Sequence, residues 1–278
     1  MIARAGSRFA AAVASVLIVL ASGVGAWAAE PVTVAPGSVV RWQGSGTESC
    51  AAYGRTWSPL GPTCWFPVDL LGEGELILTR VRDGRQEQAH VQVGAYPYPV
   101  QELQVAERMV KPDEENLPRI EREAREVAAL WTRAGPARYS LPLGRPLASA
   151  SAGRSFGARR VLNGEPRSPH SGVDLKAARG EEVLTVADGV VALADSHYFA
   201  GNSVFVDHGG GLISMYFHLD TIAVAEGQSV GRGETLGTVG ATGRATGPHL
   251  HFGLRWHGAR IDPALLLGPV EDVPTIRE

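Results

Sequence analysis

The sequence lacks features that are typical of several large protein classes. Its formal net charge is only −3, which is too small to indicate a nucleic-acid partner or an anionic membrane surface. Long apolar runs with helical periodicity are few, and no glycine-rich motif stands in the strand-to-helix context that phosphate binding requires. Turn residues, in contrast, are abundant, with 34 glycines and 18 prolines. This balance favours a mainly β protein with many turns.

Cysteine is nearly absent, because Cys50 and Cys64 are the only two in the chain. In an exported protein this pair predicts a disulfide, whose loop closure contributes about 3 kcal/mol on the chain-entropy model. Zinc binding by the two thiols is the weaker interpretation, since no further ligands cluster nearby in the sequence.

The N-terminus has the pattern of a secretory signal over residues 1–28. Two arginines precede the apolar run 9–20, and small residues at 26 and 28 offer a cleavage site. We therefore expect export to a periplasmic or extracellular location, with no stable membrane span after cleavage. The alternative is an uncleaved anchor, because the apolar stretch approaches the roughly 20 residues that span a bilayer.

The remaining chain divides by composition. We expect a small N-terminal β-sandwich-like domain over 30–98, a helix and linker over 99–150, an antiparallel-sheet domain over 151–267 and a C-terminal tail over 268–278. The helix is expected from Asp113 to Arg133. Its apolar stripe, which must dock on one of the domains, consists of Leu117, Ile120, Ala124, Val127 and Trp131.

Three short segments in the second half carry histidines with zinc-ligand character. His170 and Asp174 are separated by three residues, His218 ends a β-prone run, and His249 and His251 alternate within another. Imidazole nitrogen and carboxylate oxygen are good zinc donors, and a catalytic zinc site uses three protein ligands. His170, Asp174 and one histidine of the final pair would supply such a set. In a strand the pair would share one face, so one could bind metal while the other reaches water or substrate.

The order and spacing of these segments closely resemble those of the lysostaphin-type (LytM-like) zinc endopeptidases of peptidoglycan. The similarity runs from about Ser155 to Pro263 and includes the string Thr246-Gly247-Pro248-His249-Leu250-His251-Phe252. It implies a lysostaphin-like peptidase domain that binds one Zn²⁺ per chain through His170, Asp174 and His251. It also implies that His218 and His249 are catalytic.

The mechanism that we expect gives the two flanking histidines different tasks. His249 accepts the proton of the attacking water and His218 stabilises the developing oxyanion, or the two roles are exchanged. The sequence departs from the family beside the site, since Phe217 stands where a small residue is frequent and Gly253 where an acidic one is common.

The expected partners are peptidoglycan peptides, with D,D cross-links favoured over glycyl bonds by analogy with the family. Two alternatives stay open: a non-catalytic wall-binding protein or amidase activator, and an enzyme held latent by its own residues 30–150. The loop before His170 makes Arg159, Asn163 and Arg167 candidate substrate contacts. His197 and His257 lie in polar, turn-like segments and are expected to be exposed.

Overall fold

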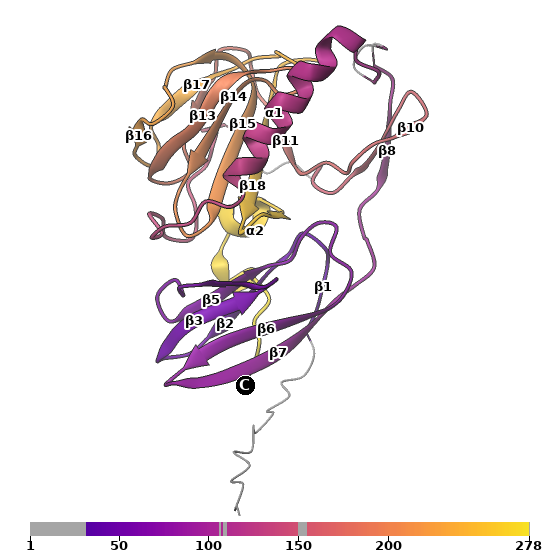
Figure 1. The fold of residues 1–278 in the computed structure, drawn as a ribbon. Helices are drawn as coiled ribbons and strands as arrows, with labels where there is room; N and C mark the ends of the chain where they lie inside the picture. The colour runs from indigo at the N-terminus through magenta and orange to yellow at the C-terminus, as the bar shows by residue number, and fades with distance from the viewer. Residues whose placement is uncertain (1–31, 106, 108–109, 150–154, 278) are drawn as a thin grey trace, which may run out of the picture.

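The computed structural model describes residues 32–105, 107, 110–149 and 155–277. The expected signal segment, residues 1–28, lies outside the described residues. Two β-rich units lie one above the other, the N-terminal unit in indigo and purple and the larger C-terminal unit mostly in orange (Figure 1). The chain is mainly β, and its largest sheet is antiparallel throughout, as the sequence predicts.

The N-terminal unit is built from two sheets. Its strands are β1 (Val32–Val34), β2 (Val39–Gln43), β3 (Thr47–Ala52), β4 (Arg55–Trp57), β5 (Thr63–Pro67), β6 (Gly74–Arg82) and β7 (Arg85–Val93). The larger sheet has the order β1-β7-β6-β3-β4, and β2 pairs with β5. The predicted disulfide is present, and Cys50 and Cys64 are both fully buried where they join β3 to β5.

The connecting segment contains β8 (Val100–Leu103), η2 (Glu114–Asn116) and α1 (Leu117–Leu130). The helix is shorter than expected, and it docks on the C-terminal unit through Leu130 and Trp131, which pack with Phe205. The stretch after it was expected to be a linker, yet Leu143 and Leu147 are buried in the main core. This stretch therefore contributes packing as well as connection.

The C-terminal unit is organised around a nine-stranded sheet. Its elements, with the small strands that precede the sheet, are β9 (Arg159–Leu162), β10 (Glu165–Pro166), β11 (Gly172–Lys176), β12 (Glu182–Leu184), β13 (Gly189–His197), β14 (Gly201–Asp207), β15 (Leu212–Ile222), β16 (Ser229–Val230), β17 (Thr235–Val239), β18 (His249–Trp256), β19 (Ala259–Ile261), α2 (Ala264–Leu267) and η3 (Val270–Asp272). The main path is β11-β18-β15-β14-β13-β16. A separate sheet, β10-β9-β8, includes the strand of the connecting segment.

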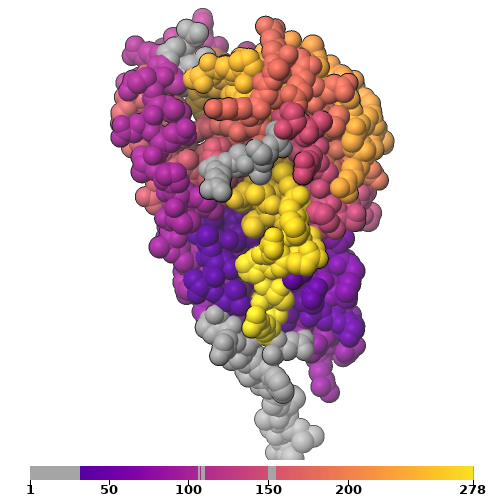
Figure 2. Space-filling view, turned by 180° about the vertical axis from the view of Figure 1, so that it is seen from behind, coloured from indigo at the N-terminus to yellow at the C-terminus, as the bar shows by residue number. Residues whose placement is uncertain are grey.

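The two units share a continuous core. Trp65 of β5 stacks near Trp256 of β18 with ring centroids 6.2 Å apart, and Asp69 forms an ion pair with Arg260 at 2.6 Å. The C-terminal tail returns to the N-terminal unit, where Ile276 is buried, and Figure 2 shows this yellow segment lying over the indigo region. Among the described helices, none has both the length and the apolar character needed to cross a bilayer.

Candidate metal centre and active site

Two neighbouring strands hold three of the predicted site residues. β18 carries His249 and His251 on one face, because they are two residues apart in a strand. β11 pairs with β18 in a register that sets Asp174 opposite His251. His170 lies just before β11, and a Cβ at Gly172 would stand 2.7 Å from His251 Nε2. A glycine at 172 therefore lets the chain pass close to His251.

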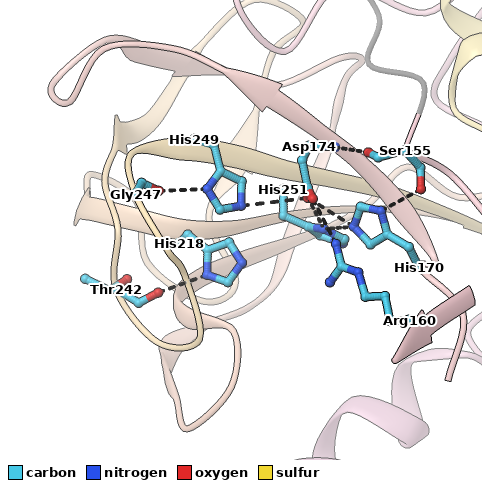
Figure 3. Close-up of polar contacts among 9 residues, drawn as sticks. All are labelled: Ser155, Arg160, His170, Asp174, His218, Thr242, Gly247, His249 and His251. Carbon is cyan, nitrogen blue, oxygen red and sulfur yellow. Dashed lines mark hydrogen bonds and ion pairs between the residues drawn. The ribbon is translucent and has the colours of Figure 1, made fainter. Parts of the chain in front are cut away.

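The contacts of His170 define which of its nitrogens faces the site. Its Nδ1 donates to the carbonyl oxygen of Ser155 at 2.9 Å, so the neutral ring presents an unprotonated Nε2. That Nε2 lies 2.8 Å from His251 Nδ1 and 3.0 Å from Asp174 Oδ1. His251 Nδ1 is also 3.0 Å from Asp174 Oδ1, which closes a triangle of three donor atoms (Figure 3).

This donor set fits one zinc ion. All three ligand atoms lie within 4.8 Å of one another, and a tetrahedral zinc with bonds of about 2.0–2.1 Å separates its ligand atoms by about 3.3 Å. Two neutral nitrogens and one carboxylate oxygen are ligands that zinc accepts. Of the final histidine pair, His251 joins the triangle, whereas His249 Nε2 is 3.8 Å from Asp174 Oδ1.

Burial and charge set the protonation of this group. Burial alone would raise the pKa of Asp174, but its contacts with the rings of His170 and His251, and the charges that these rings carry when protonated, lower it far below its usual range. Burial lowers the pKa of His251 to about 4, although its hydrogen bond to Asp174 opposes the shift. Near neutral pH the group therefore consists of a carboxylate and a neutral His251, the forms that bind metal.

The backbone at His218 brings a second pair of rings together. In a regular strand Phe217 and His218 would face opposite ways, but His218 has a φ of 65° and β15 is irregular just beyond it. Its ring centroid lies 4.8 Å from that of His249, beside the triangle. Burial, followed by the charges of His251 and His249, lowers the pKa of His218 to about 3.

Both flanking histidines are anchored by backbone carbonyls. His218 Nδ1 donates to Thr242 at 2.9 Å, and His249 Nδ1 donates to Gly247 at 2.8 Å (Figure 3). Each neutral ring therefore presents an Nε2 that can accept a proton.

Other polar residues named from the sequence have partners within the chain. The side chain of Asn163 bonds the backbone of Val105 in both directions at 2.9 Å. Arg159 lies over the ring of Tyr96, and Arg167 pairs with Glu165.

The expected exposure of two histidines is wrong. His197 ends β13 buried at 7% exposure and bonds Ser203, because the strand runs further than its polar residues indicate. His257 stacks on Trp57 with centroids 4.2 Å apart, because the N-terminal unit covers the turn that carries it.

Sequence reasoning missed Ser155 and Arg160 as residues of the site. Ser155 accepts from His170 through its carbonyl, and its Oγ accepts from the backbone N–H of Asp174 at 2.8 Å. Arg160 donates to Asp174 Oδ2 at 2.9 Å. Their roles depend on the tertiary arrangement, although both lie near the start of the segment that resembles the family.

Comparison with known families and proteins gives matches centred on this unit. The model of peptidase family M23 matches residues 168–263. The peptidoglycan DD-endopeptidase ShyA of Vibrio cholerae serotype O1 is 43% identical over 95 residues, which are 34% of this chain and 22% of ShyA. The DD-carboxypeptidase/endopeptidase Mpg of Neisseria meningitidis serogroup B is 38% identical over 104 residues, 37% of this chain and 24% of Mpg. The chain thus spans about a quarter or less of the length of these curated relatives.

One solved structure matches nearly the whole chain. A crystal structure from Pseudomonas aeruginosa assigned to peptidase M23 is 32% identical, with a TM-score of 0.66. The match covers 86% of this chain and 96% of that one, so the similarity extends to the N-terminal unit.

Proposed function

The chain belongs to peptidase family M23, and from this we propose that it is an exported zinc endopeptidase that hydrolyses peptide cross-links of peptidoglycan. The observation that carries the proposal is the convergence of His170, Asp174 and His251, with two anchored histidines beside them. The names of ShyA and Mpg support peptidoglycan as the substrate and favour D,D bonds. A peptidoglycan substrate and the N-terminal sequence pattern both support a location outside the cytoplasm.

His170, Asp174 and His251 are the proposed ligands of one zinc ion per chain. When bound there, zinc supplies Lewis-acid polarisation of a peptide carbonyl and lowers the pKa of water. Ser155 fixes the tautomer of His170, so that its Nε2 lone pair faces the other two donors. A non-catalytic wall-binding protein or amidase activator is not favoured, because the ligand set is complete.

The two flanking histidines are proposed to manage protons and orientation. His249 is the more solvent-accessible of the two, so a positive charge on its ring costs less there. We assign to His249 the acceptance of the proton from the attacking water and its later return to the leaving amine.

His218 is buried and neutral, and its Nε2 can accept a hydrogen bond without donating one. This tautomer suits the orientation of a water or a substrate N–H better than the stabilisation of an oxyanion.

Digestion of purified sacculi tests the proposal. The zinc-loaded protein should release muropeptides whose masses identify D,D cleavage, and the chelator-treated protein and an Asp174→Asn variant should release none. Asp195→Asn, at an exposed strand position, is the matched control and should digest like the wild type. Full digestion by metal-free protein would disprove the mechanism, and cleavage at glycyl bonds alone would disprove the choice of bond.

A further inference from the structure

The two oxygens of the Asp174 carboxylate have different partners. Its Oδ1 faces His170 Nε2 and His251 Nδ1 at 3.0 Å each, while its Oδ2 accepts from Arg160 Nη2 at 2.9 Å. Figure 3 shows the guanidinium of Arg160 pointing to the carboxylate, and Arg160 belongs to β9, which lies outside the main sheet. The side chains of Arg160 and Asp174 are 23% and 29% exposed, so this ion pair is only partly screened by solvent.

The direction of Arg160 is fixed by the strand that carries it. β9 pairs in parallel with β8, with Arg160 beside Gln101, and the carbonyl of Arg160 accepts from Arg167 N at 2.8 Å. Neighbouring strand residues point to opposite faces, and Arg159 accordingly turns away to lie over Tyr96 at 4.5 Å. The β10-β9-β8 sheet therefore directs the side chain of Arg160, and not that of Arg159, toward Asp174.

An oriented carboxylate binds metal better than one that rotates freely. A charge-assisted hydrogen bond from a guanidinium is short and directional, and partners of this kind behind a ligand typically change metal affinity 10- to 100-fold. Arg160 also lies before the segment 168–263 that the family model covers.

We propose that Arg160 is a positioning residue that holds Asp174 Oδ2, so that Oδ1 faces His170 and His251. The connecting strand β8, which supports β9, thereby stabilises the metal centre. This inference rests on the proposed function in one respect, namely that the centre binds zinc.

Zinc affinity measured by competition with a chromophoric chelator tests the role of Arg160. Arg160→Gln should weaken zinc binding by roughly 10- to 100-fold and change the visible absorption spectrum of the Co²⁺-substituted protein. Arg160→Lys should recover part of the affinity, because an ammonium restores the charge without the planar geometry of the guanidinium. Arg159→Gln, one position away on the opposite face, should keep the wild-type zinc affinity and Co²⁺ spectrum.

The outcomes separate this inference from the proposed function. If the wild type binds zinc and digests sacculi while Arg160→Gln binds zinc equally well, the role of Arg160 is refuted and the proposed function stands. If the wild type binds no zinc, both are refuted. Thermal unfolding of the metal-free variants checks folding, and if Arg160→Gln is unfolded, a wild-type zinc affinity and Co²⁺ spectrum in a folded Arg160→Met, which cannot donate to Asp174, would overturn the inference.

Discussion

The ring of Phe217 lies nearly parallel to the imidazole of His251, with centroids 5.2 Å apart and planes that differ by 10°. The two residues are opposite each other in the pairing of β15 with β18, so their side chains share one face of the sheet. Phe217 also packs against Phe205, at 5.3 Å. Phe217, which stands where a small residue is frequent in the family, therefore limits the rotation of His251, a proposed zinc ligand.

Phe217→Ala should weaken zinc binding by roughly 10-fold, the lower end of the range for groups that orient a ligand. The His251 ring would lose its neighbour on one side and could leave the orientation in which Nδ1 faces Asp174. Phe217→Leu retains apolar volume and should lose less affinity. Competition with a chelator measures the zinc affinity of both variants. A Phe217→Ala protein with wild-type zinc affinity would refute the role of Phe217 in orienting His251.

His218→Ala and His249→Ala should each lower the rate of cross-link hydrolysis by roughly 100- to 10,000-fold, because proton transfer and orientation contribute on this scale. Both variants should retain stoichiometric zinc, since neither residue belongs to the triangle of donors. Release of muropeptides and metal content are measured on the same samples. His90→Ala is the control, because His90 is half-exposed in β7 and pairs with Glu75, away from the donor triangle. A loss of zinc in either site variant would reassign that histidine as a ligand.

Local rules predict part of the triangle, whereas the choice of His251 over His249 follows from the family resemblance. A strand places His249 and His251 on one face, and an H-x-x-x-D spacing lets His170 precede a strand that carries Asp174. The φ of 65° at His218 could not be predicted, since no glycine or turn signal marks it. Arg160 was missed because its contact depends on β9 pairing with β8, a strand from a segment expected to connect domains.

His208 should make stability depend on pH. Burial lowers its pKa to about 4, and it bonds the carbonyl of Asp188 and the hydroxyl of Ser214 as a neutral ring. Above the ordinary pKa of about 6.5 both folded and unfolded chains are neutral at this residue, so its contribution is fully present. Between about 6.5 and 4 the unfolded chain takes up the proton first, and the contribution is lost as the pH falls.

On acidification from pH 6.5 to pH 4, the free energy of unfolding should fall by about 3 kcal/mol because of His208. Urea unfolding of the metal-free protein at pH 7.5 and pH 4.5 measures it. His208→Gln should be less stable at pH 7.5 but should lose less stability on acidification than the wild type. His90→Gln should leave the difference between the two pH values unchanged. Equal acid losses in His208→Gln and the wild type would contradict the prediction.

The C-terminal tail should stabilise the N-terminal unit, a role that its sequence does not indicate. Ile276 is 4% exposed in a cluster otherwise formed by residues of the N-terminal unit, and Arg41 exchanges backbone hydrogen bonds of 2.9 Å with Pro274 and Ile276. Ile276→Ala should lower the stability of the unit by about 2–4 kcal/mol, because it leaves a cavity in the core. Hydrogen exchange in β2 and β5 should accelerate, while Arg277→Ala, at an exposed position, should have no effect. Unchanged exchange in Ile276→Ala would mean that the unit is stable without the tail.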